Sequence, residues 1–86
     1  MTIRPVGQAT ARPVYEIAQE IHRLWQPMNY AAKPYAKAML ELSSPRDMYY
    51  DDRGDGIIAY FLSNATTWKG PDARRIKAEL RAMIKR

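Results

Sequence analysis

Apolar residues recur every three or four positions along most of this chain, which is the spacing of one face of an α-helix. No segment alternates apolar and polar residues for long, so the sequence predicts no strands. Proline and glycine separate the apolar segments at intervals typical of short helices. The pattern therefore predicts an all-α fold, a compact bundle of about four short amphipathic helices.

Four segments carry a helical apolar face. The first is residues 13–25, where a proline stands in the first turn, a position that needs no backbone N–H donor. The second begins at Ala31 or Lys33 and ends at residue 42. The third, about 56–68, is the most apolar and is expected to form the centre of the core. The fourth begins at Pro71 and continues to the chain end.

The segments between these helices contain turn signals. Ser44-Pro45-Arg46-Asp47 is typical of a capped helix start and predicts a short helical turn through Tyr49 or Tyr50. Residues 51–56, with three aspartates and two glycines, predict a loop that caps the next helix. The connection at residues 69–70 is very short, so the last two helices are expected to meet at a sharp angle or as a tight hairpin. Up-down and orthogonal arrangements both remain open.

Length and composition favour one domain. Residues 1–12 lack the apolar core of a secretory signal and are interpreted as a flexible tail, with 13–86 as a single helical domain. The chain has no cysteine, which suits a reducing compartment and removes disulfides and thiolate chemistry. Its longest apolar run, 56–62, is too short to cross a bilayer. A cytoplasmic protein with no membrane partner is expected.

The net charge of +5 is confined to one part of the chain. Residues 1–68 hold seven basic and seven acidic side chains, whereas residues 69–86 hold seven basic and two acidic ones. In the last helix one flank carries Arg74, Lys77, Arg81 and Lys85. The other flank carries Arg75 and Arg86 beside Asp72 and Glu79, and small residues, Ala78 and Ala82, separate the flanks. Such a helix suits the phosphates of a nucleic acid, although a terminal helix also needs a solvated face.

The last two helices and their short connection also resemble a helix-turn-helix unit in outline. In that interpretation the last helix enters a groove of DNA, and its first two turns contact bases or phosphates. The residues concerned are Ala73, Arg74, Arg75 and Lys77. Helix pairs joined by a glycine-containing turn are common, so the alternative is ordinary helix packing.

The residues expected of metal sites and catalytic sites are missing. The spacing of Asp51, Arg53 and Asp55 resembles the opening of a calcium loop, but Arg53 and Leu62 stand where acidic ligands are needed. His22 is the only histidine, too few for a metal site, and no serine has the context of a nucleophile. The sequence therefore predicts no metal, no cofactor, no catalytic residue and no enzymatic activity.

The aromatic residues divide into two groups. Trp25, Phe61 and Trp68 lie on apolar faces and are expected to anchor the core. Tyrosines are favoured at protein interfaces, so Tyr49 and Tyr50, with Asp51 and Asp52, form a candidate protein-contact loop. The alternative is that these tyrosines are half buried with their hydroxyl groups in water.

Two stretches resemble small uncharacterised proteins from phages of actinobacteria. One is residues 30–35, YAAKPY, followed by Ala38, Met39 and Leu42; the other is residues 56–80, GIIAYFLSNATTWKGPDARRIKAEL. The resemblance covers about two thirds of the chain and implies a phage setting and action inside a bacterial cell. It brings no catalytic residues and no assigned role.

Two hypotheses follow. The first is a small, non-enzymatic, phage-type accessory protein that binds nucleic acid, DNA rather than RNA, through the basic last helix. The residues expected to contact phosphates are Arg74, Arg75, Lys77, Arg81 and Lys85. The second is a protein-binding module that targets a bacterial host protein, or associates with itself as a homodimer, through the loop of Tyr49, Tyr50, Asp51 and Asp52 or through the basic helix against an acidic partner. A self-assembling structural component is a further alternative.

Overall fold

The computed structural model describes residues 12–84. Four helices lie in this range, α2 (Val14–Leu24), α3 (Lys33–Met39), α4 (Gly54–Ser63) and α5 (Pro71–Ile84), together with a two-stranded hairpin, β1 (Met48–Tyr49) and β2 (Asp52–Arg53). The fold is compact and mostly helical, as predicted, but the hairpin means that it is not purely all-α. The prediction of a flexible tail falls on residues that, except for Arg12, lie outside the described part of the chain.

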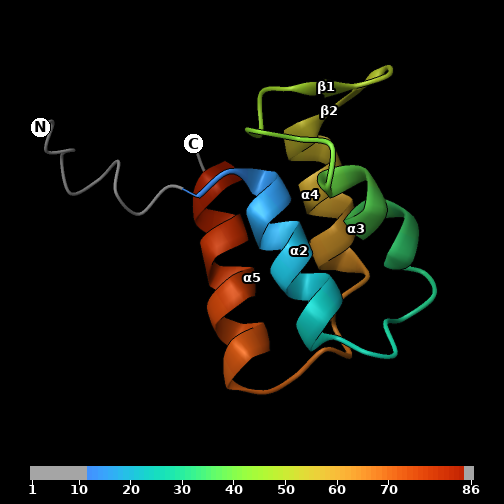
Figure 1. Ribbon diagram of the computed structural model, residues 1–86, viewed down its shortest axis with the longest axis vertical. Coiled ribbons are helices and arrows are strands. Elements are labelled where there is room, and N and C mark those ends of the chain that lie inside the picture. The colour runs from blue at the N-terminus through green and yellow to red at the C-terminus, as the bar shows by residue number, and fades with distance from the viewer. Residues whose placement is uncertain (1–11, 85–86) are drawn as a thin grey trace, which may run out of the picture.

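The four helices surround one core. Each helix packs against two others, α2 against α3 and α5, and α4 against α3 and α5. In Figure 1, α2 runs away from the hairpin end and α5 returns beside it, so these two helices are antiparallel. The largest fully buried side chains come from all four helices and from the turn after α3: Phe61, Ile17, Ile21, Met39, Leu42, Ile58, Ile76, Leu80 and Val14.

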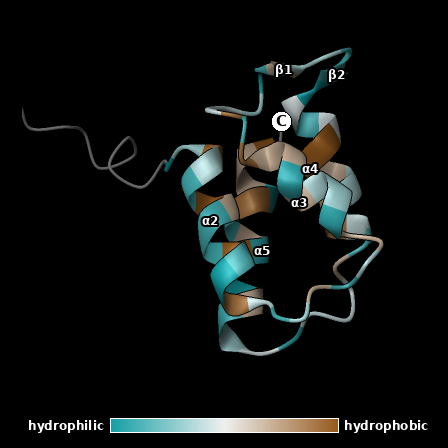
Figure 2. Cartoon of the chain, turned by 45° about the vertical axis from the view of Figure 1, so that its right-hand side comes forward, coloured by the Kyte–Doolittle hydropathy of each residue, from teal (hydrophilic) through white to brown (hydrophobic). Residues whose placement is uncertain are grey.

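The first helix forms largely as the apolar spacing predicts. Val14, Ile17, Ala18 and Ile21 are buried at one-turn spacing, and Figure 2 shows hydrophilic residues on the outward side of α2. The first N–H groups of a helix have no partner within it. Here the N–H of Val14 donates to the carbonyl of Ser43, and that of Tyr15 to the carbonyl of Leu42. These bonds attach the start of α2 to the chain beyond α3.

The predicted helical turn after Ser44 is wrong, because a hairpin forms there. The carboxylate of Asp47 accepts the N–H groups of Ser43 and Ser44, at 2.7 and 3.1 Å, and so closes a turn rather than capping a helix. The chain then forms β1 and β2, pairing Met48 with Arg53. The N–H bonds to the Asp47 carboxylate hold its pKa below its ordinary value.

Helix α4 begins and ends earlier than predicted. It begins at Gly54, whose N–H donates a hydrogen bond of 2.7 Å to the carbonyl of Asp47. The two segments come so close here that a β-carbon at Gly54 would lie 3.0 Å from the carbonyl oxygen of Pro45, which explains why this position is a glycine. The helix ends at Ser63 because the side-chain amide of Asn64 donates to the carbonyl of Tyr60 at 2.8 Å. The connection to α5 is therefore residues 64–70, not the two residues expected from the sequence.

The expected core aromatics are buried in the structure. The rings of Trp25 and Trp68 stack with centroids 5.1 Å apart, and Phe61 meets Trp25 edge-on. None of the helices within residues 12–84 combines the length and apolar character needed to cross a membrane.

Candidate nucleic-acid interface

Helix α5 carries its charged residues on two flanks of a buried stripe. Ala73, Ile76 and Leu80 are buried, which fixes the rotation of the helix about its axis. The start is set by Gly70, whose φ of 111° is accessible to glycine at little steric cost, and by Pro71 in the first turn. The two flanks predicted from the sequence are therefore present, and they have different surroundings.

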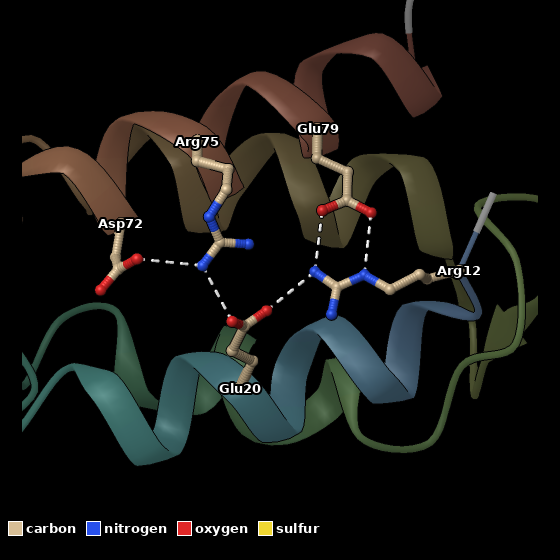
Figure 3. A network of polar contacts seen from close by, with 5 residues as sticks. All are labelled: Arg12, Glu20, Asp72, Arg75 and Glu79. Atoms are coloured by element: carbon tan, nitrogen blue, oxygen red, sulfur yellow. Dashed lines mark hydrogen bonds and ion pairs between the residues drawn. The ribbon is translucent and has the colours of Figure 1, made fainter. Parts of the chain in front are cut away.

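The flank that faces α2 is neutralised by ion pairs (Figure 3). Nη2 of Arg75 lies 2.8 Å from Oε2 of Glu20 on α2 and 3.1 Å from Oδ1 of Asp72. Arg12, just before α2, binds Glu79 with two hydrogen bonds of 2.8 and 3.0 Å and lies 2.9 Å from Oε1 of Glu20. Three carboxylates thus accompany two guanidinium groups, and this side of α5 has no excess positive charge.

This network shifts the pKa values of its members. The pKa of Glu20 is lowered, first by the hydrogen bond from Arg75 and also by Arg12, against the opposing effect of burial. The pKa of Arg75 is raised, chiefly by its bond to Glu20. The pKa of Arg12 is raised, chiefly by its bond to Glu79. Each shift favours the charged form, as expected for partners that hold one another in place.

The opposite flank of α5 lines a hollow that we call the basic groove. Its walls are Trp68, Lys69, Gly70, Arg74, Lys77 and Arg81, and its volume is about 230 Å³. No carboxylate is among these residues. Lys69, Arg74 and Arg81 form no ion pair within residues 12–84. The groove therefore concentrates positive charge that the described part of the chain does not compensate.

Lys77 shows how closely the cations gather. Its Nζ donates a hydrogen bond of 2.7 Å to the carbonyl of Ala65, which ties α5 to the segment after α4. The pKa of Lys77 is lowered, first by burial and then by the positive charges of Arg81 and Lys69. The positive charges of Arg81 and Lys69 are thus close enough to Lys77 to repel its proton. Such a local excess of positive charge is expected to attract an anion.

Three of the five predicted contact residues lie together in the basic groove: Arg74, Lys77 and Arg81. Arg75 instead lies in the ion-pair network, and Lys85 is outside the described residues. Sequence reasoning missed Lys69, which was treated only as part of a connection, although its position next to the first turn of a basic helix was a usable signal. Ala78 and Ala82 are exposed, as their position between the flanks predicts.

The helix-turn-helix interpretation fails for two reasons. Ala73, one of its expected contact residues, is buried against the core and cannot reach a base. The connection from α4 to α5 is seven residues long, whereas that motif joins its helices by a turn of three or four residues. The basic groove therefore presents the side of α5, together with Lys69, rather than the first turn of a recognition helix.

The predicted protein-contact loop forms the tip of the hairpin. Tyr49 is half buried, and its ring meets that of Tyr50 edge-on at 4.8 Å. Tyr50 is 85% exposed and has a φ of 57°, a strained backbone for a bulky residue. Asp51 and Asp52 are also exposed.

A second hollow of about 510 Å³ lies beside this loop, and we call it the tyrosine groove. Tyr35, Tyr49 and Tyr60 line it together with Pro34, Ile57 and Asp52. The rings of Tyr35 and Tyr60 stack at 5.5 Å. Sequence reasoning found Tyr49 and Asp52 but not Tyr35 and Tyr60, because these come from two helices whose packing brings them together.

The residues of the calcium-like spacing and His22 lie in different parts of the fold. Arg53 pairs with Asp55 at 3.1 Å, and the region of the calcium-like spacing forms a strand and a helix start. In the described part of the chain, no cluster of three histidine or acidic side chains is arranged to hold a metal ion. His22 lies beside a cleft between α2 and α3.

No protein-family model matches this chain, and neither does any curated protein or solved structure.

Proposed function

We propose that this protein binds nucleic acid through the basic groove. The observation that carries the proposal is the gathering of Lys69, Arg74, Lys77 and Arg81 with no carboxylate among the lining residues. Lys69, Arg74 and Arg81 form no ion pair in the described chain, and the ammonium group of Lys77 has further N–H donors beyond its bond to Ala65. These groups are therefore available to phosphates, and phosphate contacts supply most of the affinity of non-specific binding. The opposite flank of α5 is neutralised and contributes little to this binding.

The groove favours the phosphate backbone of duplex DNA over single strands. Binding of single strands usually relies on exposed aromatic rings on which bases stack. Trp68 is the aromatic residue of the groove, and it is only 6% exposed because its ring stacks on Trp25. The contacts are therefore electrostatic and carry little sequence preference. The proposed setting, a small accessory protein of a phage inside a bacterial cell, rests on the sequence resemblance alone.

Fluorescence anisotropy of a labelled DNA duplex tests this function. Four phosphate contacts predict that affinity falls by a factor on the order of 100 between about 50 and 200 mM salt. A single-stranded oligonucleotide of the same length is expected to bind more weakly. Absence of duplex binding at the lower salt concentration would overturn the proposal.

A second candidate function is protein binding at the tyrosine groove. The observation that favours it is the convergence of Tyr35, Tyr49 and Tyr60 on one hollow next to the strained and exposed Tyr50. Tyrosine offers a large contact area with a polar hydroxyl group and is enriched at interfaces. The partner is a bacterial host protein or a second copy of this chain.

Pull-down from a bacterial lysate treated with nuclease tests the second function. Tyr60→Ser removes an aromatic wall of the tyrosine groove and is expected to lose the partner. Tyr30→Ser is the matched control, because Tyr30 is 86% exposed and does not line the groove. Sedimentation of the purified protein separates self-association from a host partner. A captured protein that both variants retain would contradict binding at this groove.

A further inference from the structure

A third hollow, unrelated to the predicted contacts, lies between the end of α2 and α3, and we call it the lysine cleft. Its volume is about 440 Å³, within the usual range of small-molecule sites. Trp25, Met28 and Leu40 form its apolar part. Its polar part includes His22, Lys33 and Lys37. Apolar surface next to a few polar groups is the usual composition of a site for a small molecule.

The charge of the lysine cleft is uncompensated. Lys33 and Lys37 are one turn apart on α3, so their ammonium groups lie on the same side of the helix. Neither forms an ion pair among residues 12–84, and no carboxylate lines the cleft. Like charges at this spacing repel one another, and an anion between them would relieve the repulsion.

One of the residues that line the lysine cleft has a buried polar atom without a partner in the described structure. Nε2 of His22 is buried and has no hydrogen-bond partner in the described structure. Leaving a buried polar group without a partner is costly. The neighbouring Gln26 does not satisfy it, since the Gln26 side-chain nitrogen donates to the backbone carbonyl of His22. His22 therefore contributes its ring to the wall of the cleft, while its Nε2 is buried away from the cleft's open side.

We propose that the lysine cleft binds a small organic anion. Its carboxylate, phosphate or sulfonate pairs with Lys33 and Lys37 beside the ring of His22. Its apolar body lies against Trp25, Met28 and Leu40. Charge complementarity selects an anion, and the apolar walls select one with a hydrophobic body rather than an inorganic ion. This site is independent of the proposed nucleic-acid binding, because none of its residues lines the basic groove.

Titration with 8-anilinonaphthalene-1-sulfonate, an aromatic sulfonate that fluoresces in apolar surroundings, tests the proposal. Lys33→Gln/Lys37→Gln is expected to weaken binding about tenfold, since charge-assisted contacts are lost. N-phenyl-1-naphthylamine, the same body without the sulfonate, is expected to bind wild type more weakly. Arg23→Gln/Arg46→Gln removes the same charge from exposed positions outside both the lysine cleft and the basic groove, so it is the matched control and should bind the sulfonate as wild type does.

Nuclear magnetic resonance of the imidazole group locates the probe. His22 is the only histidine in the chain, so its ring signals are unambiguous, and they are expected to shift as the sulfonate binds. Unchanged affinity in Lys33→Gln/Lys37→Gln, or ring signals that do not move at saturation, would overturn the proposal. A double lysine variant that loses DNA affinity but keeps the sulfonate would also overturn it, because the cleft would then belong to the nucleic-acid surface.

Discussion

Nη2 of Arg75 lies 2.8 Å from Oε2 of Glu20, and this ion pair joins α5 to α2. Arg74, the preceding residue, lines the basic groove and forms no ion pair in the described chain. Two adjacent arginines on one helix therefore have different surroundings. One belongs to the contacts that hold the helices together, and the other is available to a partner.

We expect Arg74→Gln and Arg75→Gln to separate binding from stability. Arg74→Gln should weaken duplex binding roughly fivefold at about 0.1 M salt, because one phosphate contact is lost. It should leave the urea midpoint unchanged. Arg75→Gln should lower the urea midpoint, because Glu20 and Asp72 lose a partner, and it should keep most of the DNA affinity. Equal loss of affinity in the two variants would contradict the division of α5 into two flanks.

The stabilising effect of Glu20 should depend on pH. The pKa of Glu20 is lowered in the folded protein, so its contribution is present above its ordinary value of 4.5 and is lost as pH falls through the folded-state value. Glu20→Gln should reduce the free energy of unfolding by about 1 kcal/mol at pH 7, and this difference from wild type should shrink below pH 4.5.

Urea unfolding at several pH values measures this effect. Glu41→Gln is the control, since Glu41 is exposed and forms no ion pair in residues 12–84. A difference between wild type and Glu20→Gln that stays constant from pH 7 to pH 3 would rule out the ion-pair network as its source.

Gly54 and Gly56 should respond oppositely to alanine. A β-carbon at Gly54 would lie 3.0 Å from the carbonyl oxygens of both Ser44 and Pro45, so Gly54→Ala should cost about 1–3 kcal/mol by forcing the backbone to shift. A β-carbon at Gly56 would have nothing within 4 Å, so Gly56→Ala should raise the free energy of unfolding by about 0.5 kcal/mol. Thermal unfolding compares the two, and a stable Gly54→Ala protein would contradict the close approach of α4 to residues 44–47.

Tyr50 should be replaceable with a gain in stability. Its φ of 57° at the first position of a two-residue hairpin loop is unfavourable for a bulky side chain. Tyr50→Gly should therefore stabilise the protein by up to about 1 kcal/mol in thermal unfolding. If Tyr50 contributes to protein binding, the same variant should lose captured partner in the pull-down. Destabilisation by Tyr50→Gly would mean that the ring contact with Tyr49 outweighs the strain.

Much of the helical core follows from the sequence because apolar spacing alone fixes which face of a helix is buried. The stripe of Ala73, Ile76 and Leu80 is one such case. The hairpin does not follow, since strands of two residues are too short to show alternation. The end of α4 depends on one side-chain amide, that of Asn64, which an apolar pattern does not reveal.

The basic groove, too, could be predicted from the sequence only in part. The spacing of charges along α5 predicts its two flanks, because helix geometry places residues three or four positions apart on one side. It does not predict which flank is neutralised. That depends on Glu20 and Arg12, which tertiary packing brings to Arg75 and Glu79. Lys69 joins the groove through the path of residues 64–70 rather than through the helix.

The most direct test of the central claim is the slope of duplex affinity against salt concentration on logarithmic axes. For Arg74→Gln/Arg81→Gln, removal of two phosphate contacts should reduce the slope by about 1.8 relative to wild type. Arg23→Gln/Arg46→Gln removes the same charge from exposed positions outside the basic groove and should keep the wild-type slope. Equal reductions in the two variants would show that net charge, rather than the basic groove, attracts the nucleic acid.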